Sequence, residues 1–172
     1  MRNLTCCLTL LAFVTLTTAA RADLAVTSAF EGGSGVVESI DQENAVIRLT
    51  PTPHDGRGWI CWWCVKVTGI EPGQTVTIDL GGGRGVWGMP RQAAVSTDGK
   101  TWGQTPPGEN KGKRIIYRQK VDAKEAWFAW GPRFTPSDSQ ALVDRIARQS
   151  PWAEAVVLTR TRADRPVPAL RR

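Results

Sequence analysis

The sequence predicts a mainly β protein, an antiparallel β-sandwich followed by one helix and one or two strands. Three observations lead to this fold class. Short β-prone runs are separated by Gly, Pro and Asp-Gly up to about residue 134, no helical period lies between them, and a helix start signal follows at Thr135-Pro136-Ser137-Asp138. A length of 172 residues, with 41% hydrophobic and 22% charged side chains, fits one globular domain and one small further element.

The β-prone segment contains runs rich in β-branched and aromatic residues, each bounded by turn residues. These predicted strands are Ala45–Leu49, Trp59–Val67, Gln74–Leu80, Ala93–Ser96, Arg114–Gln119 and Ala126–Trp130. Trp59–Val67 is almost continuously apolar, which is typical of a central strand covered on both faces. Gln74–Leu80 alternates, so its apolar side chains are expected on one buried face. Asp98-Gly99 favours the positive φ values of a type I′ hairpin turn.

The pattern changes after Phe134. Thr135 is the expected N-cap of a helix that Ser150-Pro151 ends, and strands are expected at Ala155–Leu158 and Val167–Leu170. Residues 135–172 are too few to bury a core of their own. The predicted organisation is therefore a signal peptide at residues 1–22, a β-sandwich at 23–134 and the start of a further domain at 135–172.

The first 22 residues have the features of a secretory signal peptide. Arg2 precedes an apolar stretch at Leu4–Ala20, and Ala20-Arg21-Ala22 supplies a small-x-small cleavage pattern. The stretch is shorter than the roughly 20 apolar residues that a membrane span needs. Export to the periplasm or the extracellular space is expected, with no membrane attachment after cleavage. The mature chain retains 20 basic and 16 acidic residues without a basic stripe, so no nucleic-acid partner is expected.

Cys61-Trp62-Trp63-Cys64 is the sharpest local motif, and three interpretations stay open for it. Thioredoxin-like redox motifs lie at a helix N-terminus, whereas this one lies in a predicted strand. A structural disulfide would need a bend, because residues 61 and 64 of a strand point to opposite faces. Buried free thiols are the third interpretation. A metal site that adds His54 has no recognisable fourth ligand, so no metal site is expected.

Exposed tryptophans would favour carbohydrate binding. Trp87, in a Gly-rich loop, and Trp102, after the Asp98-Gly99 turn, are the candidates for such surface binding. The other candidates are expected in the core and are Trp62, Trp63, Trp127 and Trp130. His54 is the only histidine, so neither a catalytic triad nor a His₂Glu zinc site can be assembled, and no catalytic residue is assigned. Scattered carboxylates are expected to be solvated; they are Asp41, Glu43, Asp79 and Asp98.

Four segments together carry a family resemblance. They are Phe30-Glu31-Gly32-Gly33-Ser34, Trp62–Gly69, Val95–Trp102 and Trp127–Asp138. In this order they resemble the opening motif, the aromatic strand, the Val-Ser-x-Asp-Gly-x-x-Trp hairpin and the joining segment of the N-terminal domain of cytosolic-carboxypeptidase-like zinc metallocarboxypeptidases, in the carboxypeptidase A clan. Cys64 and Val65 replace aromatic residues of the motif. Leu158–Leu170 resembles the entry into the catalytic domain, with Thr159 and Asp164 where glycines are usual.

The resemblance implies that the parent protein removes C-terminal residues from peptides or proteins with a zinc ion. The family's His-x-x-Glu motif and later His would follow Arg172, so no catalytic residue carries over, this chain is expected to be inactive, and zinc is expected only in the missing catalytic domain. That domain is the expected partner, and exposed apolar area is expected on the helix and on Ala155–Leu158. The alternative is a free-standing exported β-sandwich module that binds a glycan, a peptide or a protein.

Overall fold

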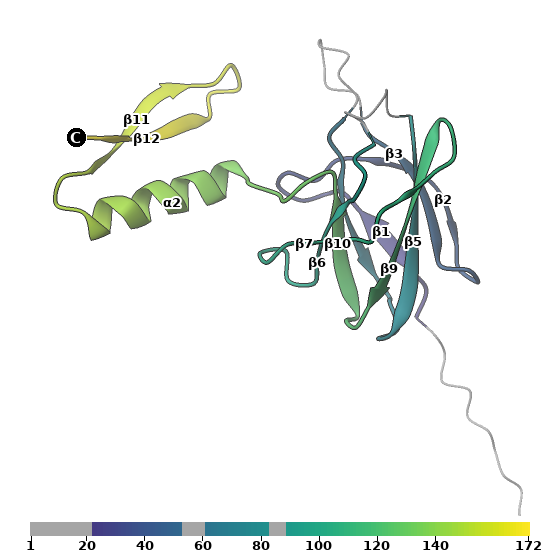
Figure 1. Ribbon diagram of the computed structural model, residues 1–172. Coiled ribbons are helices and arrows are strands. Elements are labelled where there is room, and N and C mark those ends of the chain that lie inside the picture. Colours follow the sequence, from purple (N-terminus) through teal and green to yellow (C-terminus); the bar gives the residue numbers. More distant parts are fainter. Residues whose placement is uncertain (1–21, 53–60, 83–88) are drawn as a thin grey trace, which may run out of the picture.

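The computed structural model describes residues 22–52, 61–82 and 89–172 (Figure 1). Its described residues form two five-stranded sheets and one two-stranded sheet. The first sheet runs in the order β1 (Ala25–Thr27), β4 (Cys64–Thr68), β10 (Glu125–Ala129), β6 (Ala94–Ser96) and β7 (Gly103–Gln104). The second runs in the order β2 (Val36–Asp41), β3 (Val46–Thr50), β5 (Gln74–Gly81), β9 (Arg114–Val121) and β8 (Glu109–Asn110). The predicted β-sandwich is confirmed.

Pairing in the sandwich is antiparallel with one exception. Strands β3 and β5 pair in parallel, with Val46 opposite Thr77 and Leu49 opposite Leu80. The sequence indicated only antiparallel strands, so this one parallel pair was not expected. The reason lies in the connection: the chain leaves β3, adds β4 to the other sheet and then returns, so β5 runs in the same direction as β3.

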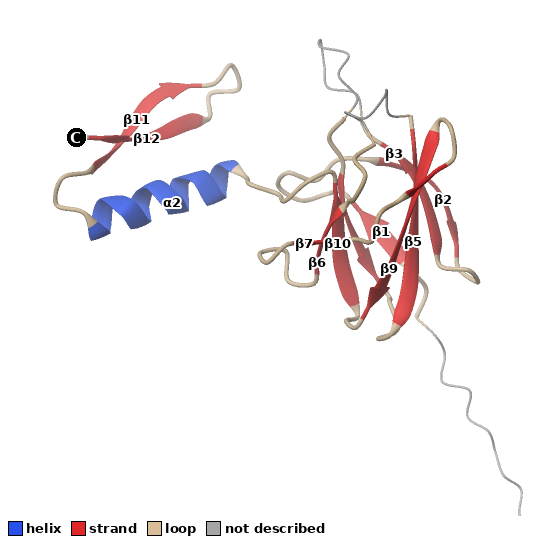
Figure 2. Cartoon of the chain, in the orientation of Figure 1, coloured by secondary structure: helices blue, strands red, loops and turns tan. Residues whose placement is uncertain are grey.

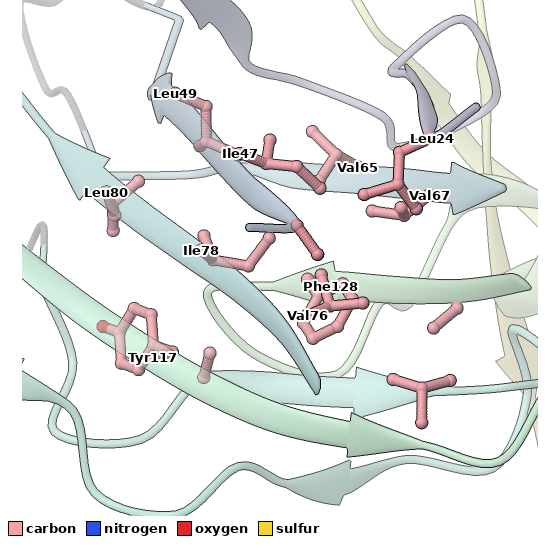
Figure 3. Packing of buried hydrophobic residues seen from close by; sticks show 14 of the residues in the cluster. Leu24, Ile47, Leu49, Val65, Val67, Val76, Ile78, Leu80, Tyr117 and Phe128 are labelled. Carbon is pink, nitrogen blue, oxygen red and sulfur yellow. The ribbon is translucent and has the colours of Figure 1, made fainter. Parts of the chain in front are cut away.

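The core lies between the two sheets. Strand β5 turns Val76, Ile78 and Leu80 inward, all fully buried, as its alternating sequence predicts (Figure 3). Val65 of β4 and Phe128 of β10 face them from the first sheet (Figure 3). The remaining large, fully buried side chains of this cluster are Ile47, Leu49, Trp63, Val67 and Tyr117. Of the tryptophans expected in the core, Trp63 is fully buried, whereas Trp62, Trp127 and Trp130 are half-buried.

The predicted strand Trp59–Val67 is shorter than expected. Residues 59–60 lie outside the described part of the chain, residues 61–63 have no regular structure, and the strand begins at Cys64. Both faces of β4 are covered, which explains the continuous apolar run: Val65 and Val67 face the sandwich core. Cys64 lies in a second, smaller cluster with Phe30, Trp62 and Trp102.

The turn after β6 differs from the predicted type I′ hairpin. A type I′ turn needs positive φ at both central residues. Here Gly99 has a φ of 70°, but the φ of Asp98 is not positive. Residues 97–102 form a longer connection, and the Asp98 carboxylate accepts hydrogen bonds from the backbone N–H of Lys100 and of Thr101, both at 2.7 Å. These bonds hold the pKa of Asp98 far below its usual range.

Asp79 is the carboxylate that the sequence analysis misplaced. It is only 8% exposed, whereas a solvated side chain was expected. Its carboxylate pairs with the guanidinium of Arg48 at 2.9 Å and of Arg114 at 2.5 Å, and Arg114 also pairs with Glu38 at 3.1 Å. Two arginines from the neighbouring strands β3 and β9 thus compensate the buried charge.

Helix α2 (Pro136–Gln149) and the hairpin of β11 (Glu154–Arg160) and β12 (Pro166–Arg171) follow the sandwich. Thr135 is the N-cap, as predicted, and forms a capping box with Asp138. Helix and hairpin lie together at one side of the sandwich (Figure 2). Asp164, in the hairpin turn where the family motif usually has glycine, has a φ of 55°, so the turn keeps the left-handed conformation that favours glycine.

No helix in the described part of the chain is long and apolar enough to cross a bilayer.

Candidate functional site: the joint between the sandwich and helix α2

Three of the four motifs meet where the sandwich passes into helix α2. The Phe30–Gly33 turn, Gly99 of the β6–β7 connection and the segment Arg133–Asp138 form this contact, which we call the joint. Within residues 22–52, 61–82 and 89–172, no three His, Cys, Asp or Glu side chains gather closely enough to hold a metal ion. The contacts of the joint hold helix α2 against the sandwich.

Arg133 connects the three segments. Its Nη1 donates to the backbone oxygen of Glu31 at 3.2 Å, and its Nη2 donates to that of Gly99 at 3.4 Å. The guanidinium carbon lies 5.5 Å from the centroid of the Phe30 ring, within the range of a cation–π contact. The Nε atom is buried without a hydrogen-bond partner. Arg133 thus ties the chain that leaves β10 to two loops of the sandwich.

Carboxylates on both sides of the joint accept hydrogen bonds from backbone N–H groups at the start of the helix. Glu31 Oε1 accepts from the N–H of Ser137 at 3.2 Å, and Asp138 Oδ2 accepts from the N–H of Thr135 at 2.8 Å. The Ser137 hydrogen bond lowers the pKa of Glu31, and the Thr135 backbone hydrogen bond lowers the pKa of Asp138. Because Glu31 belongs to the sandwich, its bond to Ser137 fixes the start of α2 against the sandwich.

Gly32 shows why the opening motif carries glycine. Its φ is 78°, and a Cβ atom at this position would lie 3.1 Å from Cδ of Arg133 and 3.2 Å from Cγ2 of Thr135. The indole N–H of Trp62 donates to the Gly32 carbonyl at 3.0 Å, so the aromatic motif supports the same turn. A side chain at Gly32 would displace Arg133, which donates a hydrogen bond to this turn.

Cys61 and Cys64, the cysteines of the described residues, lie beside this joint and are free thiols in the structure. Cys64 is buried against Ala94 and Ala129, whereas Cys61 is half-buried before the strand begins. Burial raises the pKa of the Cys64 thiol to about 11, and the nearby Arg133 opposes that shift. A thiol with so little thiolate is a poor nucleophile, which disfavours redox catalysis. His54, the third residue considered for a metal site, lies outside the described residues.

We expect iodoacetamide at pH 8 to alkylate Cys61 of the native chain at least about tenfold faster than Cys64, because burial withholds both the thiolate and access. Peptide mapping by mass spectrometry measures both rates. The Cys64 rate should increase as the pH rises toward its raised pKa. In denaturant the two rates should become equal. Equal rates in the native chain, or two thiols that react only after reduction, would contradict the placement of Cys64.

Of the two tryptophans predicted for surface binding, only Trp102 lies in the described part of the chain. Trp102 is half-buried and packs against the cluster of Cys64, Ala94 and Ala129. Trp87 lies outside the described part of the chain. Cys64 and Trp102 are thus brought together in one packing cluster, without forming an exposed aromatic face. Binding of a glycan through these residues stays a prediction.

The motifs of the joint are recognisable in the sequence, but the sequence assigned no role to Glu31 or Arg133. Glu31 lies at the opening of the sandwich and Arg133 at its end, and no spacing rule brings such distant residues together. The signal that could have found them is the pair of glycines next to Glu31, since a Gly-Gly step next to an acid indicates a close backbone approach.

Comparison with known proteins places these features in a family. The family model of the cytosolic carboxypeptidase N-terminal domain matches residues 26–130. A comparison with curated proteins found no similar sequence.

Solved structures resemble the chain at low sequence identity. A metallo-carboxypeptidase from Burkholderia cenocepacia aligns with a TM-score of 0.74 and 22% identity over 86% of this chain and 39% of its own. A metallo-carboxypeptidase from Pseudomonas aeruginosa, solved with (2-guanidinoethylmercapto)succinic acid, aligns with a TM-score of 0.72 and 19% identity over 85% of this chain and 39% of its own. The chain thus spans about two fifths of either structure. Since the family model covers most of the sandwich, from β1 to the end of β10, this chain belongs to the cytosolic carboxypeptidase N-terminal domain family.

Proposed function

We propose that this chain supplies the non-catalytic N-terminal module of a metallocarboxypeptidase-like protein, whose activity is the hydrolysis of C-terminal residues from peptides or proteins. In this proposal the sandwich is the folded base, the joint sets the direction of helix α2, and the hairpin of β11 and β12 presents a surface to a carboxypeptidase catalytic domain. The family match and the fold of the two solved metallo-carboxypeptidases support this role.

The observation that carries the proposal is the apolar surface of the hairpin. Trp152 is 75% exposed just before β11, and Val157 and Leu158 of β11 are 57% and 71% exposed. Leu170 of β12 is also exposed. Consecutive exposed apolar residues on a small hairpin are typical of a surface that another protein covers. The expected exposure of the β11 segment is therefore present.

The expected exposure of the helix is met only at Ala141. No large apolar side chain of α2 is exposed: Val143 is buried, and Leu142, Ile146 and Ala147 are half-buried. The helix packs against the hairpin (Figure 1). The docking surface in the proposal is thus the hairpin and Trp152, without the apolar face of α2.

The catalytic zinc of a carboxypeptidase does not fit the residues described here. They contain no group of metal-ligating side chains, and the sequence contains no His-x-x-Glu motif. The proposal therefore assigns the zinc ion and the hydrolytic step to the catalytic domain and derives no step from this chain. Export stays a prediction that rests on residues 1–22.

We expect Val157→Lys combined with Leu158→Lys to reduce the fluorescence of a bound hydrophobic dye by at least about half, because the charges interrupt the apolar surface of the hairpin. The thermal midpoint of the sandwich should remain within about 2 °C of the parent value, since both residues are exposed. Dye titration and thermal unfolding measure the two quantities.

Val36→Lys is the matched control, because Val36 is 51% exposed but lies on β2 of the sandwich. It should change dye binding only slightly. An equal loss of dye binding in Val36→Lys would argue against a docking surface on the hairpin. Release of C-terminal residues from peptides by the purified chain, with or without added zinc and detected by mass spectrometry, would overturn the non-catalytic role.

A further inference from the structure

Strand β9 has an edge that its neighbour covers only in part. Strand β8 pairs with it through two positions, Glu109 opposite Ile116 and Asn110 opposite Ile115. On its other side β9 pairs with β5 over its whole length, from Arg114 to Val121. Before β8, Pro107 has no N–H group that could extend the ladder. Beyond Ile116, the edge of β9 has no partner strand among the described residues.

Two backbone hydrogen bonds show which backbone groups of β9 point to this edge. The Arg114 carbonyl accepts from Lys111 on the β8 side, whereas the Val121 carbonyl accepts from Gly73 on the β5 side. Backbone groups alternate along an antiparallel strand, so Arg118 and Lys120 present their N–H groups toward the open edge. The Arg118 carbonyl points the same way, while the side-chain amide of Gln119 donates to the Lys120 carbonyl at 2.7 Å.

A groove runs beside this edge. It has a volume of about 400 Å³ and lies between the end of β9 and the connection from β6 to β7. Its apolar lining includes Val95, Val121 and Ala123, which pack against the sandwich core, and its polar lining includes Ser96 and Thr101. A side chain that an added strand turns inward would enter this groove, and a small apolar side chain fits its lining best.

The outer face of the same edge carries two basic side chains, of which Lys120 pairs with Asp122 at 4.0 Å. Arg118 and Lys120 are exposed on the face opposite the buried Tyr117 and Val121. The neighbouring strand β8 places an acidic side chain beside Arg118: Glu109 pairs with it at 3.2 Å. A second copy of β9 would place like charges opposite one another, which disfavours pairing between two copies of this chain.

We propose that the edge of β9 beyond Ile116 binds an extended peptide segment of another protein by strand addition. Backbone hydrogen bonds to Arg118 and Lys120 give the affinity. Acidic side chains at alternate positions lie beside Arg118 and Lys120, and small apolar side chains between them enter the groove at Val95 and Val121. The occupant is thus a strand that alternates acidic and small apolar residues. The hairpin of β11 and β12 takes no part in this contact.

The experiment uses a labelled peptide of alternating Glu and Val, a peptide of the same composition in block order, and a Lys-Val counterpart. Fluorescence polarisation should show saturable binding of the Glu-Val peptide alone. Arg118→Glu combined with Lys120→Glu should weaken that binding by about tenfold and admit the Lys-Val peptide. Hydrogen exchange should show new protection at the amides of Arg118 and Lys120, without change at Ile116, which β8 already pairs.

Arg162→Glu combined with Arg165→Glu makes the same change of charge on the exposed turn of the hairpin and should leave binding unchanged. Equal binding of the alternating and block peptides would overturn the proposal in favour of simple charge attraction. Protection of the Arg118 and Lys120 amides that depends on the concentration of the chain alone would overturn it in favour of self-association. Absence of binding by all three peptides would refute it directly.

Discussion

Phe128→Ala is expected to lower the free energy of unfolding by about 3–5 kcal/mol, since it removes a large side chain from the middle of the core and leaves a cavity. Phe128 is 0% exposed, and β10 places it between Val65 of β4 and Val95 of β6. Residues held in two ladders cannot move far enough to fill the space. Urea unfolding followed by tryptophan fluorescence measures the change.

Phe134→Ala is the matched control for this prediction. Phe134 loses the same atoms but is 66% exposed, so its replacement should change the free energy of unfolding by less than about 0.5 kcal/mol. Similar losses in the two variants would show that Phe128 does not pack between the sheets as described.

Gly33→Ala is expected to lower the free energy of unfolding by more than about 2 kcal/mol, although it adds only a methyl group. A Cβ atom at Gly33 would lie 2.1 Å from the backbone oxygen of Ser28, and backbone cannot yield as a flexible side chain does. The Phe30–Gly33 turn must therefore open, and with it the carbonyl of Glu31 that receives Arg133. Unfolding measurements give the stability, and hydrogen exchange of helix α2 gives the effect on the joint.

Gly131→Ala tests whether the loss is specific to the turn. Gly131 lies in the segment between β10 and α2, its φ is not positive, and a Cβ atom there would have nothing within 4 Å. Alanine restricts the unfolded chain, so the variant should be neutral or slightly stabilised, by up to about 1 kcal/mol. A tolerated Gly33→Ala beside this control would show that the opening turn accepts a side chain.

Local patterns predicted the parts of the fold that local interactions decide. Thr135 and Ser150-Pro151 predicted both ends of α2, because capping and proline act within one turn of the helix. The alternation of Gln74–Leu80 predicted the buried face of β5 for the same reason. The start of β4 was predicted too early, since Trp62 and Trp63 have strand-forming side chains but are held by contacts of the joint and the core.

Contacts between distant residues explain the predictions that were wrong. Asp79 looks like any surface aspartate in the sequence, and only the pairing of β3, β5 and β9 brings Arg48 and Arg114 to it. The joint was missed for the same reason. Glu31 and Arg133 belong to motifs that carry the family resemblance, but their contact depends on the completed sandwich. A type I′ turn was excluded by the side chain of Asp98, whose hydrogen bonds stabilise a longer connection.

The position of β10 has a consequence for synthesis of the protein on the ribosome. Strand β10 is the last strand of the sandwich in the chain, yet it lies at the centre of the first sheet, between β4 and β6. Until Ala129 has left the exit tunnel, β4 and β6 have no common neighbour and the first sheet lacks its central strand. The nascent chain therefore exposes apolar strands for most of its translation, and a chaperone that holds it until β10 arrives would favour correct folding over aggregation.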